Sequence, residues 1–234
     1  MSFKEYLLEA GDTEGTHELV KTSLADAVSL AKAEFAKAGK DFQKILPSFE
    51  KNFLLAQKMA RQGHTVRKDM PVIKRKDVWL LQRHLLRGAL DINKPYAPET
   101  KPSNPFPQGL KGKEAERFLK AGFRDGNVKD DVVSYRSVPK AAKDLKPIQQ
   151  QIYLDKAINF TITNDKQDYA KSVKDSYMLA SDDSHILDGH HRWLACMLFD
   201  PKITMSALII DMHLDKLLKV LLAYGDAIGN ERNA

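Results

Sequence analysis

The sequence predicts an α+β protein whose N-terminal half is all-helical and whose C-terminal half mixes short strands with helices. Between residues 17 and 62, apolar residues recur at spacings of three and four, which is the period of an amphipathic helix. Gly39 and Pro47 interrupt this run, so we expect two helices joined near 39–47. Beyond residue 113, short apolar runs alternate with turn residues, which indicates strands.

A third helix is expected at 77–87, where Asp77 can cap its start and Gly88 follows its end. Residues 91–113 then hold five of the chain's ten prolines, and such a segment favours an extended linker over a continuous element. We therefore expect a helical domain at 1–90, a Pro-rich linker at 91–113 and a mixed α+β domain at 114–234.

The C-terminal elements follow from alternation of apolar residues and from turn residues between them. Tyr177–Ala180 and His185–Asp188 flank Ser181–Ser184, a pattern typical of a β-hairpin. Pro147 keeps the segment 145–149 extended. The other expected elements are a helix at 114–123, a strand at 132–138, a helix within 150–171, a strand at 203–212 and an amphipathic helix at 214–222.

Composition narrows the classes of protein that the chain can belong to. No apolar run approaches the roughly 20 residues of a membrane span, and acidic residues interrupt the apolar N-terminus. Neither a membrane segment nor a secretory signal is therefore expected. A single cysteine, Cys196, excludes an intramolecular disulfide, and we expect a cytoplasmic protein.

The net charge of +6 is concentrated in one basic segment. Between residues 61 and 87 there are eight Lys/Arg and two Asp, and such a segment favours a polyanionic partner, DNA before membrane. A solvated basic surface without a specific partner is the alternative interpretation. The candidate DNA-binding residues are Arg67, Lys68, Lys74, Arg75 and Lys76.

The run Asp188-Gly189-His190-His191-Arg192 is the strongest functional signal in the chain. It joins a strand-like segment to a helix-like one, and a strand–glycine–helix junction aims free backbone N–H groups at an anion. Gly189 permits the tight turn, and Arg192 can hold phosphate oxygens in a bidentate fork. The histidines can donate hydrogen bonds, carry charge or transfer protons. Asp188 can orient a histidine, bind Mg²⁺ or accept a proton.

Two other interpretations of this run are open. In the first, Asp188 merely caps the helix and the histidines are surface residues. The second is a metal held by the protein, which is not expected, because strand alternation turns His185 away from Asp188 and the spacing matches no strong zinc pattern. Mg²⁺ that arrives with a nucleotide keeps most of its waters and needs only one or two carboxylates.

The segment Ile186–Ala195 resembles the second signature box of the ParB/sulfiredoxin superfamily. Leu145–Gln149 resembles the first box, in which a proline and a glutamine two residues later recur, here Pro147 and Gln149. The resemblance covers about residues 132–212. It implies a small mixed-sheet α+β domain that binds nucleotides at the helix after the second box. Members include CTP-hydrolysing partition proteins, ATP-using sulfiredoxins, free-serine kinases and ParB-like nucleases.

The serine-kinase-like members carry the most similar motif, which matches Asp188 to Arg192 throughout. The catalytic cysteine of sulfiredoxins is replaced by His190, so sulfinic-acid reduction is not expected. The Gly-Glu-Arg-Arg run of partition proteins is matched only at Gly189 and Arg192. The kinases' upstream glutamate base has no counterpart here, because residues 149–151 are glutamines and Asp155 is the nearest carboxylate.

Three functional hypotheses follow from the sequence. The first is a nucleotide-binding enzyme that hydrolyses a nucleoside triphosphate or transfers its phosphoryl group, using ATP, ADP or CTP with Mg²⁺. The second is a ParB-like nuclease acting on DNA. The third is a non-enzymatic DNA-binding or virion-assembly protein that keeps the fold as a scaffold. Residues 3–9 are similar to the openings of some large-phage proteins, and a phage-encoded protein is expected in the host cytoplasm or the virion. In the first hypothesis the catalytic residues are Asp188, His190, His191 and Arg192, and the phosphate-binding residues are Gly189, Arg192, Pro147 and Gln149.

Overall fold

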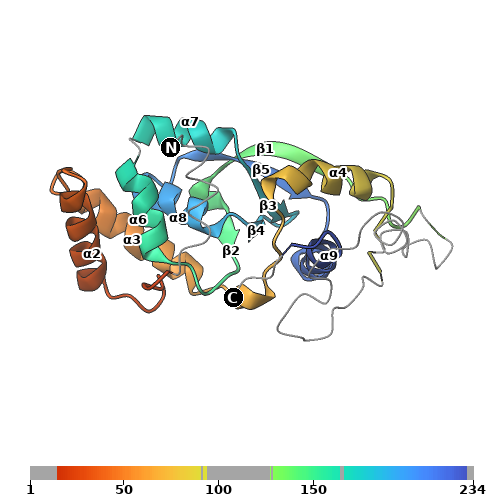
Figure 1. Ribbon diagram of the computed structural model, residues 1–234, viewed down its shortest axis with the longest axis horizontal. Coiled ribbons are helices and arrows are strands. Elements are labelled where there is room, and N and C mark those ends of the chain that lie inside the picture. The colour runs from red at the N-terminus through yellow and green to blue at the C-terminus, as the bar shows by residue number, and fades with distance from the viewer. Residues whose placement is uncertain (1–14, 91, 94–126, 128, 164–165, 231–234) are drawn as a thin grey trace.

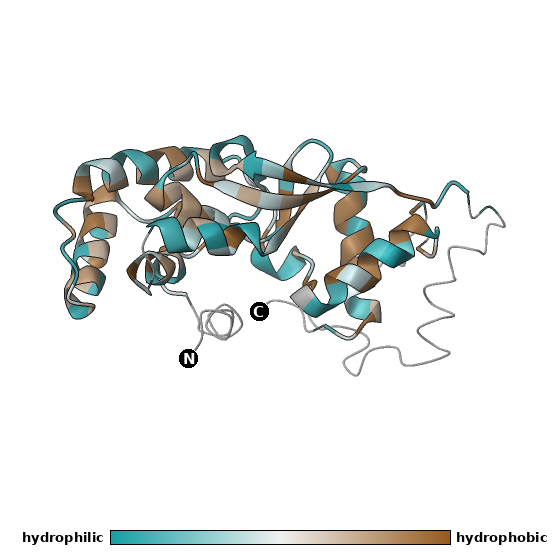
Figure 2. Ribbon diagram, turned by 90° about the horizontal axis from the view of Figure 1, so that it is seen from above, coloured by the Kyte–Doolittle hydropathy of each residue, from teal (hydrophilic) through white to brown (hydrophobic). Residues whose placement is uncertain are grey.

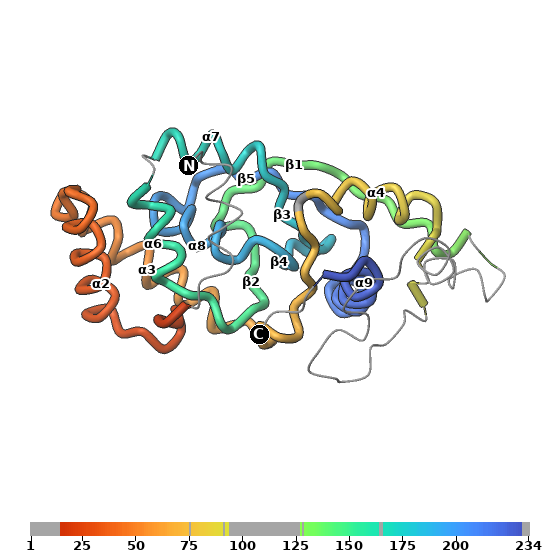
Figure 3. Tube along the Cα trace, viewed as in Figure 1, coloured from red at the N-terminus to blue at the C-terminus, as the bar shows by residue number. Residues whose placement is uncertain are grey.

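The computed structural model describes residues 15–90, 92–93, 127, 129–163 and 166–230. Figure 1 shows a central sheet with helices on both sides, and Figure 3 follows the chain through the same view. The α+β class predicted from the sequence is confirmed, with helices in the N-terminal half and a five-stranded mixed sheet in the C-terminal half. The helix expected at 114–123 lies outside the described residues.

The sheet has the strand order β1-β5-β3-β4-β2. β1 pairs antiparallel with β5, β5 runs parallel to β3, β3 pairs antiparallel with β4, and β4 runs parallel to β2. The hairpin predicted at 177–188 is confirmed as β3 and β4, and the strand predicted at 203–212 is confirmed as β5. The bounds are β1 Tyr135–Ala141, β2 Lys146–Pro147, β3 Tyr177–Ser181, β4 His185–Asp188 and β5 Thr204–Ile210.

The strand expected at 132–138 begins three residues later, at Tyr135, and includes Pro139. Proline cannot donate to a ladder and is therefore confined to edge positions, and β1 is an edge strand of this sheet. The segment expected to be extended at 145–149 contributes the two-residue strand β2, which forms the other edge.

Alternation along the strands divides the apolar side chains between two cores. In β4, Ile186 belongs to one core and its neighbour Leu187 to the other. The same division separates Ala207 from Leu208 in β5, since successive side chains of a strand point to opposite faces. The sheet is therefore buried on both faces and needs helices on both.

Among the described residues, helices pack in both cores, so both faces of the sheet are covered (Figure 1). These helices carry both hydrophobic and hydrophilic residues, as Figure 2 shows. The hydrophobic side of each helix packs in the core. On the first face are α2 (Leu24–Lys37), α3 (Leu46–Ala60), α6 (Leu154–Thr163), α7 (Lys166–Lys174) and α8 (His190–Phe199). On the second face are α4 (Val78–Leu86) and α9 (Leu214–Ala227).

The N-terminal helices begin and end close to where the sequence predicts. Ser23 caps α2 by accepting a hydrogen bond from the Asp26 amide at 3.1 Å, and Pro47 lies in the first turn of α3. Asp77 precedes α4 as expected, but its carboxylate does not cap the helix. Instead it accepts a hydrogen bond from the Asn230 amide group at 3.2 Å.

The helical half and the sheet share both cores. Phe53 of α3 packs in the core that contains Trp193 of α8, and Leu81 of α4 packs in the core that contains Leu217 of α9. The boundary expected at 91–113 falls almost wholly outside the described residues. None of the described helices combines the length and the hydrophobicity needed to cross a lipid bilayer.

Candidate functional site

The turn at Gly189 has the strand–glycine–helix form that the sequence predicts. β4 ends at Asp188, Gly189 has φ +106° and ψ 20°, and α8 begins at His190. This positive φ favours glycine. A Cβ atom at this position would lie 3.1 Å from Arg192 Nη2 and 3.3 Å from Met178, so the space is also tight.

His190 links residues 148 and 149 to the start of α8 through hydrogen bonds. Its ring is 4% exposed, and Nε2 accepts hydrogen bonds from the amides of Ile148 (3.2 Å) and Gln149 (3.3 Å). A ring nitrogen that accepts carries no proton, so the imidazole is neutral with its proton on Nδ1. Burial agrees with this assignment, because it lowers the pKa of His190 to about 3.

His191 makes the corresponding contact four residues further along the same loop. Its Nε2 accepts a hydrogen bond from the Tyr153 amide at 3.1 Å. The rings of His191 and Tyr153 are stacked, with centroids 6.0 Å apart and planes 4° from parallel. Burial lowers the pKa of His191 well below its ordinary value, and the nearby Arg67 and Lys156 charges lower it further.

These contacts determine what the histidines can do. Both imidazoles are turned toward the loop 148–153 and use Nε2 as an acceptor of backbone N–H groups. In this arrangement neither Nε2 presents an N–H to a phosphate, and neither ring carries a charge near neutral pH. Their contribution here is to hold the loop 148–153 against the start of α8.

Asp188 and Arg192 form an ion pair across the turn. Arg192 Nη2 lies 2.9 Å from Asp188 Oδ2, and Arg192 Nη1 donates to the Tyr177 carbonyl at 3.1 Å. Burial raises the pKa of Asp188, while Arg192 and the Gly189 amide oppose that rise. The guanidinium is therefore fixed beside the turn, and the carboxyl group keeps its proton to a higher pH than an exposed aspartate.

The loop 148–153 is also held from the other side by two N-terminal segments. The amides of His64 and Thr65 donate to the Ile148 carbonyl at 3.0 Å, and the Gln150 amide donates back to Thr65. Residues 17–19 pair with 152–154 through hydrogen bonds of 2.7 Å. Asp155, the carboxylate nearest the first box, accepts from the backbone amides of Thr16 and His17 at 3.2 Å.

Two cations flank the Tyr153 ring beside His191. The Arg67 guanidinium lies 5.7 Å from the ring centroid and the Lys156 ammonium 5.8 Å from it. Lys156 is 6% exposed, which is unusual for a lysine. The sequence groups Arg67 with the basic segment and gives no role to Lys156 or Tyr153. The sequence signal that could have pointed to Lys156 was its position next to the apolar run of α6.

The remaining residues of the basic segment lie elsewhere on the surface. Lys68, Lys74 and Lys76 are exposed, and Arg75 begins a short 3₁₀ turn (Arg75–Asp77) that leads into α4. Arg67 contacts the loop 148–153, where its amide also donates to Gln151 Oε1 at 2.8 Å.

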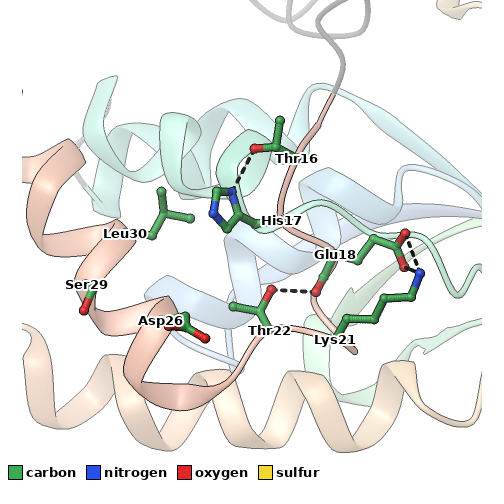
Figure 4. A pocket seen from close by; sticks show the side chains of 8 residues that line it. All are labelled: Thr16, His17, Glu18, Lys21, Thr22, Asp26, Ser29 and Leu30. Carbon is green, nitrogen blue, oxygen red and sulfur yellow. Dashed lines mark hydrogen bonds and ion pairs between the residues drawn. The ribbon is translucent and has the colours of Figure 1, made fainter.

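The first-box residues Pro147 and Gln149 make contacts within the sheet and the loop, and they do not line either cavity described below. Pro147 lies in β2 opposite Ile186, and Gln149 is buried, with its amide group donating to the Gln151 carbonyl. A cavity of about 430 Å³ borders the loop 148–153 and is lined in part by Arg61, Gln150 and Gln151. Figure 4 shows another cavity, of about 530 Å³, between residues 16–22 and α2. Neither cavity is lined by Asp188–Arg192.

The described residues contain no group of three or more His, Cys, Asp or Glu side chains arranged to hold a metal ion. The site offers the backbone amides at the start of α8, three cations and one carboxyl group. No family model, curated protein or solved structure matches the chain. The ParB/sulfiredoxin resemblance thus stays a prediction based on the two boxes.

Proposed function

We propose that this protein binds a nucleotide by its phosphates at the start of α8, and that it hydrolyses the nucleotide or transfers its phosphoryl group. The nucleotide is ATP, ADP or CTP with Mg²⁺. The binding groups are the backbone amides of residues 190–192 together with the cations beside them, Arg67, Lys156 and Arg192.

The charge pattern at the start of α8 carries this proposal. The first N–H groups of a helix have no acceptor within it, and the helix dipole makes this end positive. α8 has no acid in its first turn, its N-cap is Gly189, and Arg67 and Lys156 lie next to its second residue, His191. Cations close to the positive end of a helix favour the binding of an anion there.

The loop 148–153 completes the site in this proposal. His190 and His191 position the loop, and Pro147 and Gln149 set its path. The rings are thus positioning residues rather than proton carriers. Asp188 is the carboxyl group that can accept a proton from an attacking nucleophile or contact Mg²⁺, once the phosphate has drawn Arg192 away from it. Bound Mg²⁺ would neutralise charge on the phosphates, as it does in other phosphoryl-transfer enzymes.

Calorimetric titration with each nucleotide in the presence of Mg²⁺ tests the proposal. Arg67→Ala and Lys68→Ala are a matched pair, because the two cations are adjacent in sequence and only Arg67 contacts the site. We expect saturable binding that Arg67→Ala weakens by about tenfold or more, which corresponds to about 1.4 kcal/mol. We expect Lys68→Ala to bind like the unaltered protein.

Absence of binding for all three nucleotides, or equal losses in the two variants, would contradict the proposal. Phosphate release measured on the same samples then separates hydrolysis from binding alone. The nuclease hypothesis is tested by nicking of a supercoiled plasmid. Nicking that requires Arg67 without any nucleotide binding would favour that hypothesis instead.

A further inference from the structure

The outward face of α4 carries a large exposed aromatic side chain. Val78, Leu81 and Leu85 face the core, while Trp79 is 65% exposed and Leu86 is 50% exposed. Trp79 is the most exposed of the large hydrophobic side chains in the described part of the chain. An exposed indole offers an aromatic face on which a ligand ring can stack.

One cation contacts this indole, and three others lie near it in the sequence. The Arg83 guanidinium lies over the Trp79 ring, 5.6 Å from its centroid. Lys74, Lys76 and Arg87 flank α4 on both sides and are exposed. The helix itself contains no carboxylate, since its sequence is VWLLQRHLL.

The environment of α4 is positive as well as aromatic. Asp77, the acid immediately before the helix, is half-buried and bound by Asn230. His84 faces inward, with Nδ1 3.3 Å from the Tyr224 hydroxyl. Burial lowers the pKa of His84, and the charges of Arg83 and Arg87 lower it further.

We propose that this face of α4 binds single-stranded nucleic acid, with a base stacked on Trp79 and backbone phosphates paired with Arg83, Arg87, Lys74 and Lys76. An exposed ring among cations is the arrangement by which proteins hold unpaired bases without reading their sequence. In duplex DNA the base faces are stacked on one another inside the helix, so no base face is free to stack on the indole. A membrane surface needs a wide apolar face, and here Val78, Leu81 and Leu85 of α4 are used in the core, which leaves Trp79 and Leu86 as its exposed large apolar side chains.

This surface is separate from the proposed nucleotide site. α4 packs in the core on one face of the sheet, and α8 packs in the core on the other (Figure 1). Loss of one site therefore leaves the other intact, and the two proposals can fail independently.

Fluorescence anisotropy of the full chain with a labelled 20-nucleotide oligothymidine tests this inference, with a duplex of equal length as the comparison. We expect tighter binding to the single strand. Trp79→Ala should weaken that binding about five- to a hundredfold, which is the range for one base stacked on an aromatic ring. Trp79→Phe should keep most of the affinity, because phenylalanine also offers a π-face. Arg83→Ala should reduce the slope of log affinity against log salt by about 0.7.

The controls are substitutions on α3, away from this face. Leu54→Ala replaces another half-exposed apolar residue, and Lys58→Ala replaces another exposed cation. Both should bind the oligonucleotide like the unaltered protein. Binding should also quench the fluorescence of Trp79, while Trp193, the other tryptophan, is fully buried.

Three results would overturn the inference. The first is equal affinity for duplex and single strand with no effect of Trp79→Ala, which would make the patch a general polyanion surface. The second is absence of oligonucleotide binding at low salt. The third is binding of anionic phospholipid vesicles that requires Trp79 while the oligonucleotide does not bind.

Discussion

The buried ring of His190 makes the stability of the fold depend on pH between about 7 and 5. Burial lowers its pKa to about 3 in the folded chain, against 6.5 when the chain is unfolded. Below pH 6.5 the unfolded chain therefore binds a proton that the folded chain does not, so the free energy of unfolding falls as the pH falls. The contribution is complete above pH 6.5 and is lost progressively toward pH 3.

The slope is about 1.4 kcal/mol per pH unit for one such group, and the loss from pH 7 to pH 5 is about 2 kcal/mol. His191 and His84 act in the same direction, since burial lowers their pKa values too. Comparison of variants is therefore needed to isolate the contribution of His190 to the pH dependence of stability. His190→Gln retains an acceptor oxygen for the loop amides but does not titrate.

Urea unfolding at pH 7, 6 and 5, followed by circular dichroism, measures this dependence. We expect His190→Gln to be less stable at pH 7 but to lose about 2 kcal/mol less than the unaltered protein between pH 7 and pH 5. His64→Gln, which replaces an exposed histidine, is the matched control. If His190→Gln shows the same pH dependence as the unaltered protein, the neutral acceptor role of His190 is wrong.

Three further substitutions, with Gly39→Ala as a control for the first, test the packing around the site by denaturant unfolding. Gly189→Ala and Gly39→Ala should each cost about 1–2 kcal/mol because both glycines have positive φ, but only Gly189→Ala should also weaken nucleotide binding. Equal nucleotide affinity in the two variants would contradict this expectation. Gly63→Ala places a methyl group 2.7 Å from a backbone oxygen of the loop 148–153 and should lower the free energy of unfolding by roughly 1–3 kcal/mol. An unchanged stability would show that the loop is not held there. Trp193→Phe removes an indole N–H that donates to a buried carbonyl at 2.9 Å and should cost about 1–3 kcal/mol, and a neutral result would refute that hydrogen bond.

Local sequence patterns were sufficient to predict most elements near the site. The turn residues between 177–180 and 185–188 predicted the hairpin, and Gly189 between a strand-like and a helix-like segment predicted the junction. These features depend on backbone geometry and on neighbours within a few residues. Strand alternation also placed His185 and Asp188 on opposite faces, as their neighbours Ile186 and Leu187 show.

The partners of the site residues could not be predicted in the same way. His190 meets amides about 40 residues earlier in the chain, and Arg67 meets Tyr153 across 86 residues. Periodicity carries no information about such distant contacts. A histidine pair beside glycine is equally compatible with rings turned outward to a ligand or inward to a loop, and burial decides between them. Arg67 could not be separated from its exposed neighbour Lys68 by charge alone.

The most direct measurement of the anion site is a titration followed by amide NMR on isotopically labelled protein. ATP, ADP or CTP with Mg²⁺ is added while the backbone signals of His190, His191 and Arg192 are observed. If these amides bind phosphate, their signals shift saturably with at least one nucleotide, and Arg67→Ala raises the concentration needed for half of the shift. If these three signals stay in place at saturating concentrations of every nucleotide, α8 does not begin at a phosphate site.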